Sequence, residues 1–214
     1  MKLHTSVGPN PRVVRMFMAE RGVELETIDV DIIGGENLKD EYKARNPGAQ
    51  SPCLEMDDGS FLSEITAICN YLDEISPGDT LVGDTPEQRA ETRMWNRRFD
   101  AKILEPMSLA FRSAEAIGMF ENRCHVMPNG ANDLKEIVQE SYAWLEPLMA
   151  GKAFVCGDRF TLADIQLYCF ADFGISVGQS LPADLPNLQA WFTRMSERPS
   201  APLGFHAQEL AQAG

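Results

Sequence analysis

The chain has 214 residues, 44% of them hydrophobic, which is enough for one large domain or two small ones with real cores. Its formal net charge of −13 argues against nucleic acid as a partner, because binding a phosphate backbone needs clustered Lys and Arg. No apolar run approaches the roughly 18 residues typical of a membrane span, and no signal peptide is expected. These features predict a cytoplasmic protein without a membrane partner.

Strand and helix signals alternate over the first 78 residues. We expect strands at 2–5 and 25–31, helices at 11–21, 36–45 and 64–75, and a hairpin at 53–62. The hairpin turn is Asp57-Asp58-Gly59, and Gly22 should end the first helix in a left-handed conformation. A hairpin that follows a βαβ unit predicts a mixed four-stranded sheet with the order β-α-β-α-β-β-α.

Asn10-Pro11 is a strong helix start directly behind the first strand. An Asn can cap the free backbone N–H groups of a helix, and Pro fits the first turn because its missing N–H would be unpaired anyway. Such a helix start carries a partial positive charge and open donors, which favour an anion such as a thiolate. We therefore expect chemistry near Asn10, with Ser6 close by.

The second half of the chain reads as helical throughout. Residues 79–85 are expected to form a linker, and the helical domain should cover 86–214. Its helices are predicted at about 86–116, 131–149, 162–174 and 187–197. A capping box at Thr85-Pro86-Glu87-Gln88 begins the first of them, and Thr161 and Asp164 form a second box before residue 162. We interpret Asp164 as structural rather than catalytic.

The cysteines are scattered along the chain. They are Cys53, Cys69, Cys124, Cys156 and Cys169. Their odd number and the absence of a C-x-x-C pair predict neither a disulfide framework nor a zinc site. Five reduced thiols are typical of a cytosolic protein.

Together, these elements and motifs resemble the cytosolic glutathione transferase family. The resemblance depends on Asn46-Pro47, Ser51-Pro52, Leu54, Asp58-Gly59, the run Leu62 to Ile68 that leads to Tyr71-Leu72, and Phe160 to Ile165. It implies an α/β thioredoxin-like domain at 1–78, an all-α C-terminal helical bundle, and a homodimer.

The resemblance also implies a glutathione site in the first domain. Pro52 matches the family's cis-proline, beside which the backbone of Ser51 pairs with the cysteinyl part of glutathione like an edge strand. Gln50 matches a position that contacts the glycyl end. Glu64 matches the acidic residue that holds the γ-glutamyl amine, although a purely structural role at a helix start stays open.

Two positions depart from the family pattern. Ile65 stands where a Ser usually reaches the γ-glutamyl carboxylate, so only its backbone N–H can donate there, unless Thr66 or Ser63 supplies a hydroxyl. Asn10 falls where beta-class relatives carry Cys. An amide can donate a hydrogen bond to a thiolate but cannot act as a nucleophile. We therefore expect Asn10, or alternatively Ser6, to stabilise the glutathione thiolate, unless Asn10 only caps its helix.

Neighbouring side chains are harder to assign from the sequence. Arg12 or Arg15 can face the anionic ligand, and one of them is expected to be solvated or to face a second subunit. Met107, Phe111 and Tyr168 are candidates for the electrophile pocket, although such an apolar stripe is more often core.

The sequence thus predicts a glutathione transferase-like enzyme of the EC 2.5.1.18 type. It would activate the glutathione thiolate, with glutathione as co-substrate and no metal, for attack on a small hydrophobic electrophile. Two alternatives remain open. One is glutathione-dependent reduction of a disulfide or peroxide. The other is a non-catalytic binding module, which Ile65 and the missing Tyr, Ser or Cys favour.

Overall fold

The computed structural model describes residues 1–206 and divides into two compact units. The first contains Met1–Asp84 together with the segment that begins at Arg198, and the second contains Thr85–Glu197. The boundary after Asp84 lies within the predicted linker at 79–85. The predicted helical domain runs to residue 214, whereas residues 198–206 belong to the first unit, where they pack along the first helix. Residues 207–214 lie outside the described residues.

The first unit is built on the predicted mixed four-stranded sheet. Its strands are β1 (Lys2–Thr5), β2 (Glu26–Asp29), β3 (Cys53–Glu55) and β4 (Phe61–Ser63), in the order β2-β1-β3-β4. β1 runs parallel to β2, whereas the β1–β3 and β3–β4 pairs are antiparallel, with Leu3 opposite Leu54 and Leu54 opposite Leu62. β2 is shorter than the predicted strand at 25–31.

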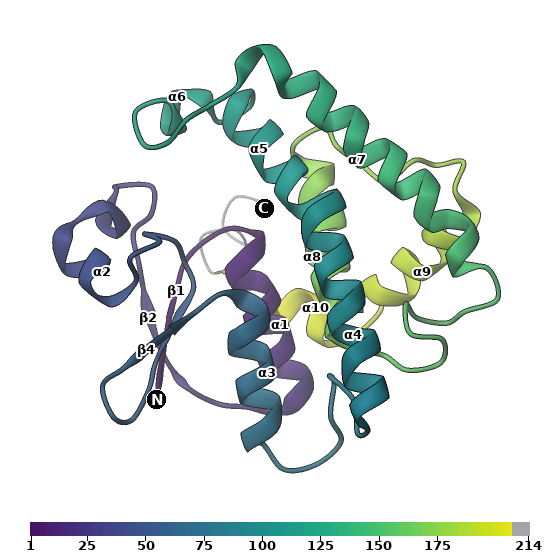
Figure 1. Ribbon diagram of the computed structural model, residues 1–214, viewed down its shortest axis with the longest axis horizontal. Helices are drawn as coiled ribbons and strands as arrows, with labels where there is room; N and C mark the ends of the chain where they lie inside the picture. The colour runs from purple at the N-terminus through teal and green to yellow at the C-terminus, as the bar shows by residue number, and fades with distance from the viewer. Residues whose placement is uncertain (207–214) are drawn as a thin grey trace. The chain divides into compact units, whose positions relative to one another are not determined.

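Helices cover both faces of this sheet (Figure 1). They are α1 (Pro9–Arg21), the 3₁₀ turn η1 (Glu36–Leu38), α2 (Asp40–Arg45) and α3 (Ile65–Ile75). A further short helix, α10 (Ser200–Leu203), packs against α1. α1 and α3 pack together and bury Phe17 and Leu72 completely. On the α2 side, Val30, Tyr42 and Cys53 form a smaller core. The helix predicted at 36–45 is split because Lys39 has an extended backbone.

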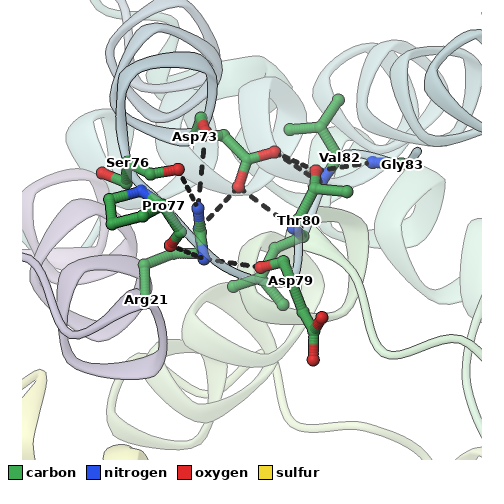
Figure 2. Close-up of polar contacts among 9 residues, drawn as sticks. Arg21, Asp73, Ser76, Pro77, Asp79, Thr80, Val82 and Gly83 are labelled. Carbon is green, nitrogen blue, oxygen red and sulfur yellow. Dashed lines mark hydrogen bonds and ion pairs between the residues drawn. The ribbon is translucent and has the colours of Figure 1, made fainter.

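A buried ion pair joins the last residue of α1 to α3 and, through further hydrogen bonds, to the chain that follows α3 (Figure 2). Arg21 Nε lies 2.8 Å from Asp73 Oδ1, and both side chains are about 5% exposed or less. The remaining guanidinium N–H groups donate to the carbonyls of Asp73, Ser76, Pro77 and Asp79. Asp73 in turn accepts hydrogen bonds from Thr80 Oγ1 and from the backbone N–H groups of Leu81 and Val82. The segment 76–83 is therefore held by side chains rather than by secondary structure.

The second unit is helical, as predicted. It contains α4 (Pro86–Phe99), the π-helical turn η2 (Asp100–Leu104), α5 (Glu105–Ser113), α6 (Ile117–Phe120), the 3₁₀ turn η3 (Pro128–Gly130), α7 (Ala131–Leu145), the 3₁₀ turn η4 (Glu146–Met149), α8 (Leu162–Ser176) and α9 (Pro186–Ser196). Phe99, Tyr142 and Trp191 are among its fully buried side chains. Across residues 1–206, no helix is both long and apolar enough to cross a membrane.

The first long helix of this unit departs from the prediction. Instead of running to 116 it widens into η2 and ends at Ser113. Pro106 has no N–H to give to the turn before it, and this lost hydrogen bond accounts for the wider turn at η2. The capping boxes at Thr85 and Thr161 are confirmed.

The Thr161 box does more than begin α8. Asp164 is completely buried, and its carboxylate accepts hydrogen bonds from the backbone N–H groups of Val155 and Thr161, from Trp191 Nε1 and from Thr161 Oγ1, at 2.8 to 3.1 Å. Two donors lie on each oxygen. One carboxylate therefore joins α8, α9 and the preceding loop, which agrees with the structural role expected for it.

Candidate functional site

The loop between β1 and α1 contains the candidate thiol-facing residues. α1 begins at Pro9, and its N-cap is Gly8, with φ of 109° and no side-chain hydrogen bond. Asn10 is the second residue of the helix, so the interpretation of Asn10 as the cap is wrong. Gly8 takes this position because its backbone adopts a positive φ that residues with a Cβ rarely reach.

Two prolines make Asn10 unusual among the residues of the first turn. Pro9 and Pro11 on either side of it have no N–H, and the Arg12 N–H is bonded to the Gly8 carbonyl at 3.3 Å. Of the first three helical residues, only Asn10 therefore has a backbone N–H. Within residues 1–206, neither this N–H nor the half-buried Asn10 amide has a hydrogen-bond partner. Both donors are open at the positive end of a helix dipole.

Ser6 is less suited to meet a ligand. Its side chain is 2% exposed, and its hydroxyl donates to the Val7 carbonyl at 3.1 Å. The Ser6 carbonyl accepts from Arg15 at 2.8 Å. The hydroxyl and the carbonyl of Ser6 are therefore both hydrogen-bonded within the protein. The geometry favours Asn10 over Ser6 as the open donor.

Arg12 and Arg15 are both engaged within the first unit. The Arg12 side chain is 3% exposed and its guanidinium lies 3.8 Å from the centre of the Phe205 ring. Arg15 donates to Gly204, Thr5 and Ser6. Arg12 is therefore not solvated, and Arg15 is half-buried. That one of these cations faces a second subunit stays a prediction.

The peptide bond between Ser51 and Pro52 is cis, as the family resemblance predicted. The Ser51 hydroxyl is buried and has no hydrogen-bond partner among the described residues. Just before it, the Gln50 carbonyl accepts hydrogen bonds from Tyr42 Oη and Asn46 Nδ2, both at 2.7 Å, whereas the Gln50 residue itself is exposed. This turn holds the start of β3 and leaves the Gln50 side chain accessible.

Glu64 occupies a strained position between β4 and α3. Its φ of 71° and ψ of 121° are rare for a residue with a Cβ, and such strain concentrates at functional sites. The Glu64 side chain is exposed, and its carboxylate has no hydrogen bond or ion pair within residues 1–206. Ile65 is the first residue of α3, whose first turn contains no acidic side chain. A carboxylate and open helix N–H groups therefore lie next to each other.

Cysteine chemistry at this site is disfavoured. Cys53 follows the cis-proline directly, but burial raises the pKa of its thiol, and the Tyr42 hydroxyl lies 3.8 Å from its sulfur. All five cysteines are free, and only Cys124 is exposed. No cluster of three or more potential metal ligands occurs in the part of the chain that the structure describes.

The three candidates for the electrophile pocket differ in exposure. Met107 is completely buried and Tyr168 is 4% exposed, with its ring 5.3 Å from that of Phe192. Phe111 is half-buried, and its ring makes an edge contact with Phe173 at 5.2 Å. Met107 and Tyr168 are thus packed in the core of the second unit, which leaves Phe111 as the partly accessible candidate.

Sequence reasoning missed two features of this site. Pro9 and Pro11 can be read from the sequence. That they leave Asn10 with the single backbone N–H among the first three helical residues follows only once the start of the helix is known. The link from Arg15 to Ser6 and Gly204 joins residues up to 189 positions apart, so no local signal indicates it.

The fold and the site define the class. A βαβαββα sheet with a cis-proline before its third strand, followed by an all-helical unit, is the architecture of two-domain proteins with a thioredoxin-like first domain. Residues 7–75 match the family model "Glutathione S-transferase, N-terminal domain", and residues 114–199 match "Glutathione S-transferase, C-terminal domain". The chain belongs to the cytosolic glutathione S-transferase family.

Individual relatives agree with this assignment. The chain is similar to the crystal structure of a glutathione S-transferase domain-containing protein from Marinobacter aquaeolei VT8, with 33% identity, a TM-score of 0.85, and coverage of 94% of this chain and 100% of that one. It is 29% identical to glutathione S-transferase 2 of Saccharomyces cerevisiae, covering 92% of this chain and 85% of the relative. It is also 28% identical to a maleylacetoacetate isomerase of Pseudomonas aeruginosa, covering 77% and 78%.

Proposed function

We propose that this protein is a glutathione transferase-type enzyme that stabilises the thiolate of bound glutathione at the N-terminus of α1 and presents it to a small hydrophobic electrophile. The observation that carries the proposal is the pair of open donors on Asn10, its backbone N–H and its amide. These donors lie at the positive end of the helix dipole before the thiolate forms. They can therefore stabilise the sulfur anion without a rearrangement of the protein.

The rest of the glutathione molecule is proposed to bind residues before β3 and at the start of α3. The backbone of Ser51 is proposed to pair with the cysteinyl part in the manner of an added strand. The Gln50 side chain, which is exposed, would meet the glycyl end. The unpaired Glu64 carboxylate would hold the γ-glutamyl amine, and the N–H groups that begin α3 at Ile65 would hold the γ-glutamyl carboxylate.

The chemistry requires only a stabilised anion. A free thiol with a pKa near about 8.5 is mostly protonated at pH 7, and donors aimed at the sulfur raise the thiolate fraction. The thiolate then attacks the electrophile, a carbon–sulfur bond forms, and the displaced electron pair leaves with the leaving group. No enzyme nucleophile takes part, which agrees with the buried Cys53 and its raised thiol pKa.

The test is an ultraviolet titration of the thiolate of bound glutathione. Replacing Asn10 by Ala removes the amide donor but keeps the backbone N–H, so the bound thiol pKa should rise by roughly 0.7, the equivalent of one hydrogen bond of about 1 kcal/mol. Ser6→Ala is the matched control and should leave the titration unchanged, because the Ser6 hydroxyl is bonded to Val7. If the Asn10→Ala titration matches wild type, Asn10 does not face the sulfur.

A pair of assays separates the proposal from its alternatives. Conjugation of an aryl halide measures attack on carbon, whereas turnover of a small disulfide measures attack on sulfur, both with glutathione as the thiol. A protein that turns over only the disulfide is a reductase. If glutathione neither stabilises the protein against heat nor retains it on an affinity column, the enzyme proposal fails.

A further inference from the structure

The residues from Arg198 to His206, called here the C-terminal segment, lie along α1. At one end, Arg198 donates two hydrogen bonds of 2.7 Å to the Glu20 carboxylate, and Ser200 Oγ donates to the same group. Burial opposes ionisation of Glu20, but the hydrogen bonds from Arg198 and Ser200 outweigh it and lower the pKa of its carboxyl. This end of the segment is fixed far from the first turn of α1.

At its other end the C-terminal segment comes close to the helix axis. A Cβ on Gly204 would lie 3.1 Å from Arg12 Cγ and 3.2 Å from Met16 Cβ, which is tighter than an ordinary contact. The next residue, Phe205, lies against the Arg12 guanidinium. Gly204 is therefore the residue that allows the segment to lie this close to α1.

Arg15 joins the segment to the candidate thiol site. Its Nε donates to the Gly204 carbonyl at 2.8 Å, and one terminal nitrogen donates to Thr5 Oγ1 at 2.7 Å and to the Ser6 carbonyl at 2.8 Å. Thr5 ends β1, and Ser6 begins the loop that leads through Gly8 to Asn10. One rigid guanidinium thus spans the C-terminal segment and the entry to α1.

We infer that Arg15 is a positioning residue: held by Gly204, it fixes the Ser6 carbonyl and through it the loop that presents Asn10 to the glutathione thiolate. This inference rests on the function proposed above. Arg15 itself meets no substrate in this scheme. Because the residues proposed to hold the ends of glutathione lie elsewhere, before β3 and at the start of α3, loss of Arg15 should affect thiol activation more than binding.

The first experiment replaces Arg15 by Met, which keeps most of the apolar stem and removes the hydrogen bonds to Gly204, Thr5 and Ser6. We expect the bound thiol pKa to rise, the pH profile of kcat to move to higher pH, and kcat at pH 6.5 to fall about fivefold with a KM for glutathione within twofold of wild type. Arg15→Lys should restore part of the shift, since an ammonium can still reach one or two of these acceptors. Gly204→Ala, with Arg15 intact, should shift the profile in the same direction.

Arg198→Met is the matched control. It removes the same charge and the two hydrogen bonds that Arg198 donates to Glu20, which lies at the other end of α1 from Asn10, so the thiol pKa should stay at the wild-type value. Thermal melting of all four variants separates a general loss of stability from a change at the loop. An Arg15→Met protein with the wild-type thiol pKa and pH profile would overturn the inference.

Hydrogen exchange of residues 5–12 keeps this test independent of the proposed function. Exchange in this loop should accelerate in Arg15→Met and Gly204→Ala and stay unchanged in Arg198→Met. If the wild-type protein binds no glutathione but exchange in the loop responds in this way, the proposed function fails. The inference that Arg15 positions the Asn10 loop is then still supported. If the wild-type protein binds glutathione as a thiolate but neither exchange nor titration responds to Arg15→Met, the positioning role of Arg15 is refuted and the proposed function is not.

Discussion

Replacement of Asp73 should strongly weaken the first unit. Its carboxylate pairs with Arg21 and accepts three further hydrogen bonds from residues 80–82 (Figure 2). Asp73→Asn keeps the shape of the side chain, removes the charge, and places an NH₂ group where an oxygen now accepts. A backbone N–H or the Thr80 hydroxyl then faces a donor, and the Arg21 guanidinium loses its counter-charge.

The size of the effect follows from burial. Both side chains are 5% exposed or less, and removing one partner of a buried pair costs about 3–5 kcal/mol. Two features place the variant at the low end of this range. Arg21 keeps its backbone carbonyl acceptors, and Asn keeps one oxygen. We expect a loss of about 3 kcal/mol, which lowers Tm by roughly 6–12 °C in a chain of this size.

The measurement is urea unfolding followed by two signals. All three tryptophans lie within 85–197, so their fluorescence reports the second unit, whereas circular dichroism reports both. Asp79→Asn is the matched control, because Asp79 contributes only its backbone carbonyl to the network and its exposed side chain points away from it (Figure 2). If Asp73→Asn costs no more than Asp79→Asn, the buried pair does not hold the segment 76–83.

Further predictions address acid stability, glutathione affinity and thiol reactivity. Burial raises the pKa of Asp164 to about 6, against roughly 3.9 in an unfolded chain, so its contribution to stability is full below about pH 4 and is lost as the pH rises through 6. The unfolding free energy of wild type minus that of Asp164→Asn should therefore fall by up to about 3 kcal/mol between pH 4 and 7, and a flat difference would contradict this. Ile65→Ser should lower the glutathione Kd about tenfold in calorimetry by adding a hydroxyl donor for the γ-glutamyl carboxylate of glutathione. An unchanged Kd would mean that this carboxylate does not bind at residue 65. Glu64→Gln should raise that Kd about tenfold without changing Tm, since the Glu64 side chain is exposed and unpaired. Iodoacetamide should label Cys124 and spare the buried Cys53 in the native protein at pH 7, and a labelled Cys53 peptide in mass spectrometry would be the contrary result.

Features encoded within a few residues were predictable from the sequence. The capping box of Thr161 and Asp164 needs only four positions, and the hairpin before α3 needs one turn signal. The π-helical turn was harder, because the pattern of apolar residues continues through it. Pro106 was the available signal, but a proline near the start of a helix and one inside a helix look alike until the boundary is known.

The start of α1 was misplaced because two start signals compete there. Asn10-Pro11 and Gly8-Pro9 each combine a residue that suits an N-cap with a proline that suits the first turn. The structure selects Gly8, whose φ of 109° fits the loop from β1. This choice depends on how β1 and α1 are joined, which Arg15 and Gly204 help to fix through contacts far apart in the sequence.

The displaced start changes what the helix can offer an anion. An ordinary helix presents several free N–H groups, but Pro9 and Pro11 leave Asn10 as the sole backbone donor among the first three residues of α1. If its N–H and its amide each contribute about 1 kcal/mol, the thiol pKa falls by roughly 1.5. A free thiol near about 8.5 would then titrate close to neutrality, so that about half of the bound glutathione is thiolate at pH 7. This degree of activation suits electrophiles that are reactive in themselves. Under the proposed function, the geometry of the Asn10 loop should therefore determine the rate.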